Sequence, residues 1–198
     1  MRIMQQISRI RFSLYRFACD PRGLAAVEFA MVLPVMLVMF FGTVEFSSGV
    51  AVDRKVTLVA RTLSDLTSQA TSVADSDLSN MFNASIGIMT PYSPTPANMT
   101  ISELYVDLNT KVVRVQWSQG AAPRAVSSTV TIPNALQVGG SYLIFSEVSY
   151  LYKPTIGYVM APAGITLRDV AYTRPRQSTC VYYTGSSGTI PTTGCPTN

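Results

Sequence analysis

The stretch of sequence that decides the fold is residues 22–46, RGLAAVEFAMVLPVMLVMFFGTVEF. Residues 24–46 form a run of 23 residues with two charges, Glu28 near one end and Glu45 near the other. At about 1.5 Å per residue, a helix of this length spans roughly 34 Å, enough to cross a bilayer. A secretory signal peptide would have a shorter apolar core with a small-residue cleavage site after it. We therefore expect residues 24–46 to form a transmembrane helix, kinked by Pro34.

A basic segment, residues 1–23, precedes the apolar run and holds five arginines and one acidic residue. The remaining chain carries ten basic and ten acidic residues, so the net charge of +4 belongs to this segment alone. Positive charge directly before an apolar helix predicts a cytoplasmic leader by the positive-inside rule. Because the rest of the chain is neutral, the charge does not indicate a nucleic-acid partner.

Beyond the membrane, apolar residues continue at helical spacing, which predicts that the helix extends over residues 47–73. Steps of four and three residues separate the members of this seam: Val52, Val56, Val59, Leu63, Leu66, Ala70 and Val73. Such a seam is typical of a helix that buries one face. Two partners remain open for it, the protein's own sheet and the helices of other subunits.

Residues 74–176 predict a periplasmic α+β domain, because a helical pattern comes first and strand patterns follow. The helix is expected over residues 75–89, capped by Asp75 or Ser76. Alternation of period two predicts an antiparallel sheet of about four strands, with a hairpin around Asn109 and Thr110. In the second strand, Val113, Val115 and Trp117 are expected to face the same way. The expected strands are residues 100–108, 111–118, 142–152 and 165–173.

The junction between the basic segment and the helix carries the most informative motif. Gly23 and Leu24 stand at the junction, and Glu28 and Phe29 follow inside the apolar run. A charged carboxylate in lipid costs about 2.5–3.5 kcal/mol on insertion scales, so Glu28 needs a partner. Cleavage after Gly23 would create an α-ammonium at Leu24 and make Glu28 the fifth residue, able to pair with the N-terminus of a neighbouring subunit. The alternative is that Glu28 lies at the headgroups, where the positive end of the helix dipole favours it.

This motif and its continuation resemble the TadE-like family of the tight-adherence secretion system. The resemblance runs from Arg22 to about Gln69, through GLAAVEFAMVLPVMLVMFFGTVEF and then VDRKVTLVARTLSDLTSQ. It implies a pseudopilin or minor pilin of the Flp type IVb pilus, a pilin-like fold, and processing after the glycine by a prepilin peptidase on the cytoplasmic side. The implied partners are other pilins and pseudopilins, the peptidase and the inner-membrane assembly platform.

Two cysteines, Cys180 and Cys195, lie in the C-terminal tail, residues 177–198, and enclose 14 residues. In an exported domain such a pair predicts a disulfide; two free thiols are the alternative. The chain has no histidine, the commonest general base and metal ligand, and no nucleotide-binding loop or hydrolase motif. We therefore expect neither an enzyme nor a metal or other cofactor.

Two functions remain as hypotheses. The first is a structural assembly protein of the inner membrane, single-pass, with a cytoplasmic N-terminus and a periplasmic domain, which enters the pilus or only primes its assembly. The second is a binding module, an uncleaved and signal-anchored periplasmic domain that binds a partner through its aromatic sheet. Cleavage after Gly23 distinguishes them.

Overall fold

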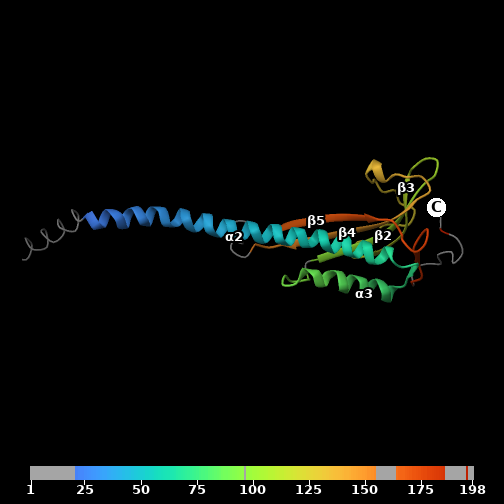
Figure 1. The fold of residues 1–198 in the computed structure, drawn as a ribbon, viewed down its shortest axis with the longest axis horizontal. Coiled ribbons are helices and arrows are strands. Elements are labelled where there is room, and N and C mark those ends of the chain that lie inside the picture. Colours follow the sequence, from blue (N-terminus) through green and yellow to red (C-terminus); the bar gives the residue numbers. More distant parts are fainter. Residues whose placement is uncertain (1–20, 96, 155–163, 186–194, 196–198) are drawn as a thin grey trace, which may run out of the picture. The chain divides into compact units, whose positions relative to one another are not determined.

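The structure, a computed structural model, describes residues 21–95, 97–154, 164–185 and 195. Most of the predicted leader, residues 1–20, and much of the predicted tail therefore lie outside the described residues. The chain divides between Ser47 and Ser48 into two compact units, and one helix continues from the first into the second (Figure 1). The elements are α2 (Pro21–Ser68), β1 (Ser72–Val73), α3 (Asp75–Ile86), a 3₁₀ turn (Gly87–Met89), β2 (Ala97–Val106), β3 (Val113–Gly120), a second 3₁₀ turn (Asn134–Leu136), β4 (Tyr142–Tyr152), β5 (Ile165–Thr173) and β6 (Tyr182–Tyr183).

The beginning of α2 differs from the predicted domain boundary. Arg22 and Gly23 were predicted to belong to a leader ahead of the helix, but both are helical in α2. Pro21 is the first residue of α2, a position where its missing N–H costs little because that group has no partner within a helix. Pro34 lies inside the helix.

In the second unit, the apolar seam of α2 packs on the protein's own sheet. Val52, Val56 and Val59 are fully buried or nearly so and share a cluster with Val148 and Tyr150 of β4. Two polar contacts fix the register of helix on sheet. Ser146 Oγ donates to the Ala60 carbonyl at 2.6 Å, and Ser64 Oγ donates to Thr173 Oγ1 at 2.8 Å. Of the two partners that the sequence left open, the sheet covers this part of the seam.

The predicted extension of the helix to residue 73 is wrong, because α2 ends at Ser68. Residues 72 and 73 form β1, which pairs in parallel with β6. The Thr71 and Val73 carbonyls accept hydrogen bonds from the N–H groups of Tyr182 and Thr184. These carbonyls are thus satisfied by the C-terminal end of the chain instead of by a further helical turn.

Helix α3 covers most of the predicted second helix, and the 3₁₀ turn completes it to Met89. The predicted caps are wrong, since the N-cap residue is Ala74, whose N–H donates to the Asp77 carboxylate at 3.0 Å. Asp75 lies inside the helix and accepts a hydrogen bond from the Tyr183 hydroxyl. Leu78 is buried in one cluster with Ile101 of β2 and Leu63 of α2.

The predicted α+β fold with a four-stranded antiparallel sheet is confirmed. The strand order is β3-β2-β4-β5, and each neighbouring pair is antiparallel. Strands β4 and β5 have their predicted bounds, whereas β2 and β3 are displaced from theirs by two or three residues. The β2–β3 hairpin turns where expected, and Asp107 Oδ1 accepts the N–H groups of Asn109 and Thr110 at its turn.

A bulge in the β2–β3 ladder overturns one prediction about β3. Val115 pairs with Leu104, but Trp117 pairs with Glu103, so Gln116 is an extra residue in the ladder. Consequently Val115 lies on the outer face with Leu104, while Trp117 lies on the face that carries the helices. The expectation that Val113, Val115 and Trp117 share one face is wrong, because one inserted residue reverses the alternation.

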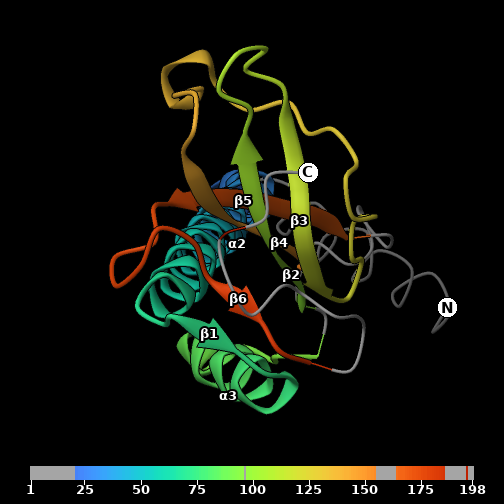
Figure 2. The ribbon, with the colours of Figure 1, turned by 90° about the vertical axis from the view of Figure 1, so that its right-hand side faces the viewer.

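Two further segments cover the sheet where the helices do not. On the outer face, Ile132 and Leu136 pack over a cluster that includes Leu143 and Phe145. On the helix face, residues 174–185, here called the C-terminal segment, continue past the end of α2 and bring β6 beside β1 (Figure 2). Val181 and Tyr183 of this segment are buried in one cluster with Trp117.

Candidate membrane and assembly segment

Residues 23–47, in the described part of the first unit, are helical, and their apolar side chains are exposed all around. Within the described residues, one helix, Gly23–Ser68, is long and apolar enough to cross a membrane, with a mean hydropathy of 2.4 in its most apolar window. None of that window is buried within the protein, and Phe29, Met31 and Phe46 are 62%, 73% and 73% exposed. A helix that is apolar on every side and packs on nothing is typical of a membrane span. This helix therefore indicates membrane anchoring.

The structure places the four predicted assembly residues at the beginning of this helix. Leu24 and Glu28 are separated by four residues, which is roughly 6 Å along the helix axis and brings them to the same side. Leu24 is 64% exposed, and the Glu28 side chain is exposed as well. A Cβ added to Gly23 would meet no atom within 4 Å, so the protein itself does not require glycine at this position. The helix thus presents an open junction and a carboxylate one turn beyond it.

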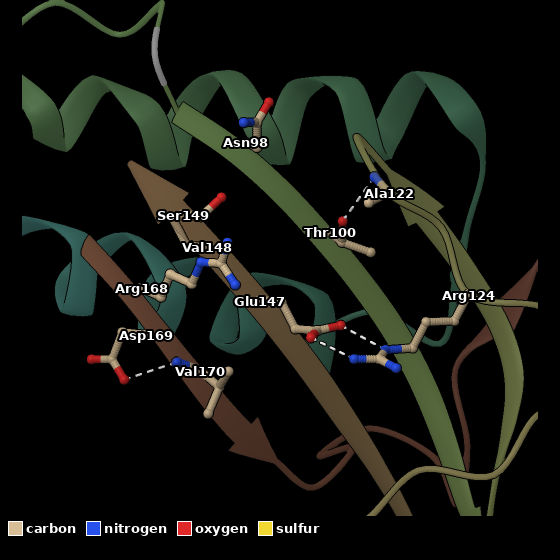
Figure 3. A pocket seen from close by; sticks show the side chains of 10 residues that line it. All are labelled: Asn98, Thr100, Ala122, Arg124, Glu147, Val148, Ser149, Arg168, Asp169 and Val170. Carbon is tan, nitrogen blue, oxygen red and sulfur yellow. Dashed lines mark hydrogen bonds and ion pairs between the residues drawn. The ribbon is translucent and has the colours of Figure 1, made fainter. Parts of the chain in front are cut away.

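A polar cleft of about 440 Å³ lies on the outer face of the second unit (Figure 3). At one end, the Arg124 guanidinium holds the Glu147 carboxylate through two hydrogen bonds of 2.6 and 2.7 Å. This contact raises the pKa of Arg124 further above its usual value. Thr100 Oγ1 accepts the Ala122 N–H at 3.2 Å, and the Arg168 side chain extends over β4 at the other end. No group of three or more potential metal ligands occurs in the described part of the chain.

One buried carboxylate in the second unit was not singled out from the sequence. Glu103 of β2 is 0% exposed, and its Oε1 accepts the Val181 N–H at 2.6 Å. Burial raises the pKa of Glu103 from 4.5 to about 8, against the opposing hydrogen bonds of Val181 and Trp117. The signal was present in β2, where Glu103 interrupts an alternating row of apolar residues between Ile101 and Tyr105. Trp117 Nε1 donates to the Val181 carbonyl at 2.8 Å. Both backbone polar groups of Val181 are therefore hydrogen-bonded to side chains of the sheet.

Cys180 and Cys195 form a disulfide in the structure, with a Cα–Cα distance of 5.8 Å. Cys180 is fully buried in one cluster with Tyr105 and Tyr142. It directly precedes Val181, which is hydrogen-bonded to Glu103 and Trp117. The bond therefore joins residue 195 to the C-terminal segment, close to the point where that segment is hydrogen-bonded to the sheet.

We expect that replacing Cys180 and Cys195 together by alanine lowers the free energy of unfolding by about 3 kcal/mol, the value for a 15-residue loop. The effect should be concentrated in the C-terminal segment, because β4 and β5 keep their pairing. Amide hydrogen exchange of the full chain in detergent measures both parts, with the oxidised protein as reference. Free thiols at both positions in protein extracted from membranes would contradict the bond.

The apolar helix and the four-stranded domain together define the class of protein, an α+β protein with one helix suited to membrane anchoring. The model of the TadE-like protein family matches residues 23–64, which are 42 of the 198 residues. The resemblance inferred from the sequence is thereby confirmed for this segment, and it indicates involvement in the tight-adherence (Flp) pilus system. No curated protein and no solved structure matches the chain.

Proposed function

We propose that this protein is a minor pilin or pseudopilin that takes part in assembling a tight-adherence pilus after cleavage by a prepilin peptidase. The observation that carries the proposal is the position of the family match, which begins at Gly23 and covers the exposed apolar helix. The match thus starts at the glycine after which a prepilin peptidase would cut. In this proposal the chain has a structural role and no catalytic one.

The proposed topology has the basic segment in the cytoplasm, α2 in the inner membrane and the second unit in the periplasm. The arginines of residues 1–23 support this orientation through the positive-inside rule. A disulfide in the C-terminal segment also agrees with an oxidising compartment. The partners would be other pilins and pseudopilins, the prepilin peptidase and the assembly platform of the inner membrane.

The proposed mechanism of assembly relies on the spacing between Leu24 and Glu28. Cleavage after Gly23 leaves a positive charge at Leu24, on the same side of the helix as the Glu28 carboxylate. Within one helix such a pair contributes only a few tenths of a kcal/mol. Pairing across two subunits removes both charges from lipid and sets one register between neighbouring helices.

We expect Gly23→Val to leave the uncleaved precursor in the membrane. A β-branched side chain would block a protease site built for glycine, while the open space around Gly23 means that the helix itself tolerates the change. Gly42→Val is the matched control, because Gly42 lies in the same helix with equally open surroundings. Mass spectrometry of the extracted N-terminus, with and without the prepilin peptidase, measures the outcome. An intact Met1 in wild-type cells with active peptidase would contradict the proposal.

A second candidate function, an uncleaved and signal-anchored binding module, is favoured by the polar cleft around Arg124 and Arg168. Its volume of about 440 Å³ is in the range of sites for small molecules. The aromatic residues that first prompted this hypothesis do not support it, because Tyr142, Phe145 and Tyr150 are buried in the core. The cleavage experiment separates the two candidates.

A further inference from the structure

The two edges of the sheet differ in how they are covered. Along β3, the backbone of residues 127–130 adds hydrogen bonds to Val113 and Val115 of 2.7–3.0 Å. Strand β5 is the other edge, and among the described residues its nine residues pair with β4 alone. A long edge strand with unpaired backbone groups is a template for another strand.

The backbone of β5 shows which groups face this free edge. The Val170 N–H donates to the carboxylate of its neighbour Asp169 at 2.8 Å, so it points away from β4. Because alternate residues of an antiparallel strand share one direction, the N–H and C=O groups of Arg168 and Tyr172 face the free edge too. Asp169 therefore occupies one donor of a row that has no further strand beside it among the described residues.

A groove of about 590 Å³ lies between this edge and the flank of α2. The flank continues at helical spacing to Leu58, which is 50% exposed. An additional strand beside β5 would thus have an exposed flank of α2 as its neighbour. The groove is lined by Arg61, Thr62, Asp65, Leu66 and residues 170–173.

The charges beside the free edge are unbalanced. Arg61 on the helix side and Arg168 on the outer side have no ion-pair partner in the part of the chain that the structure describes. Of the nearby acids, Asp65 pairs with Arg176 and Glu147 pairs with Arg124, whereas Asp169 accepts the Val170 N–H and is in neither ion pair. The two arginines outnumber this one acid, and Arg168 leaves the outer side of the edge positive, which favours an acidic occupant.

We propose that the free edge of β5 is a docking site for an extended acidic segment of another protein, which adds to the sheet as a fifth strand. Backbone hydrogen bonds to Arg168, Val170 and Tyr172 would hold the segment, as in other cases of strand addition. Its acidic side chains would lie on the outer side of the sheet near Arg168, and its apolar ones would face the flank of α2. This inference goes beyond the proposed function and does not depend on cleavage at Gly23.

The test uses the full chain in detergent and fluorescent peptides as long as β5. One peptide alternates Val with Glu, a second alternates Val with Lys, and a third is the Glu peptide with methylated backbone nitrogens. We expect the Glu peptide to bind at least about tenfold more tightly than either of the others, measured by fluorescence anisotropy. Equal binding of the methylated peptide would show that backbone pairing plays no part and would overturn the proposal.

Variants of β5 sharpen the test. Val170→Pro removes an N–H that faces the free edge but none that pairs with β4, so it should abolish binding while the fluorescence of Trp117 stays unchanged. Asp169→Ala releases the Val170 N–H and should strengthen binding. Arg168→Glu should reverse the preference toward the Lys peptide, whereas Arg114→Glu, on the opposite edge strand, should leave it unchanged.

Two results would overturn the proposal. One is an absence of binding by the Glu peptide, or binding that Val170→Pro does not reduce. The other is self-association: the Val170→Cys variant forms a disulfide-linked dimer of two copies of the chain, and adding Arg168→Glu to that variant abolishes the dimer. In that case the occupant of the edge is a second copy of this protein.

Discussion

Glu28→Ala is expected to abolish pilus assembly while protein level, membrane anchoring and cleavage after Gly23 stay as in the wild type. The substitution removes a carboxylate whose insertion in lipid costs about 2.5–3.5 kcal/mol and replaces it by an apolar residue. Insertion should therefore persist or improve. What is lost is the partner for the ammonium at Leu24 of a neighbouring subunit, and with it the shared register of the helices.

The measurement is pilus formation, together with crosslinking of the chain to the other pilins. Glu45→Ala is the control, because Glu45 lies in the same helix near the opposite end of the apolar run. A second variant, Glu28→Gln, keeps the size of the side chain without its charge and should fail like alanine. Normal assembly of Glu28→Ala, or failure only because the protein disappears, would exclude the pairing mechanism and favour the binding module.

Glu103→Gln is expected to destabilise the protein at acidic pH and to stabilise it at alkaline pH. The pKa of Glu103 is raised from 4.5 to about 8 in the folded state, so the neutral carboxyl is the form that the fold accommodates. Its contribution is complete below pH 4.5 and is lost as pH rises through about 8. Each pH unit in this interval lowers the free energy of unfolding by about 1.4 kcal/mol, or roughly 5 kcal/mol in all.

Glutamine keeps an acceptor for the Val181 N–H but does not ionise. Glu103 Oε2 has no hydrogen-bond partner in the described part of the chain, so the amide carries two unpaired N–H groups where the neutral carboxyl carries one unpaired O–H, a difference that costs about 1–3 kcal/mol. The variant should therefore be less stable than the wild type near pH 5 and more stable by about 2–4 kcal/mol near pH 9. Urea unfolding followed through Trp117, the single tryptophan, reports directly on this cluster.

Ser146→Ala is the matched control, because it removes a buried hydrogen bond on the same face of the sheet without a titrating group. It should lower stability by a similar amount at each pH. Parallel pH profiles for wild type and Glu103→Gln would show that Glu103 does not titrate in the folded protein across this range.

The parts of the fold that were predicted correctly depend on local pattern. Strand β4 alternates buried and less buried residues in its second half, so its bounds could be found from period two alone. The exposed apolar helix was equally clear, because its length and composition exceed what a soluble helix needs. The errors have a different origin, since they arise where distant segments meet.

Three residues show why these contacts between distant segments could not be predicted from the sequence. Val73 continued the helical spacing, but its backbone pairs with Tyr183, more than a hundred residues later. Trp117 followed the strand alternation until one bulged residue reversed its direction. Glu103 stands out within β2, but its contact with Val181 could not be predicted, because the C-terminal segment carries only a two-residue strand with too little pattern. The residues of the candidate assembly site could be predicted from the sequence, whereas their exposure at the beginning of α2 is known only from the structure.

In the proposed topology, the C-terminal segment has a consequence for the order in which the protein matures during export. Val181 and Tyr183 complete the cluster around Leu63 and Trp117, although they follow the last strand of the main sheet. A chain that crosses the membrane with α2 leading delivers these residues last. The domain therefore cannot close over Glu103 until almost the whole polypeptide has been translocated. A product truncated before residue 181 would leave this cluster open to water and to proteases, so in that topology the final stretch would report that export is complete.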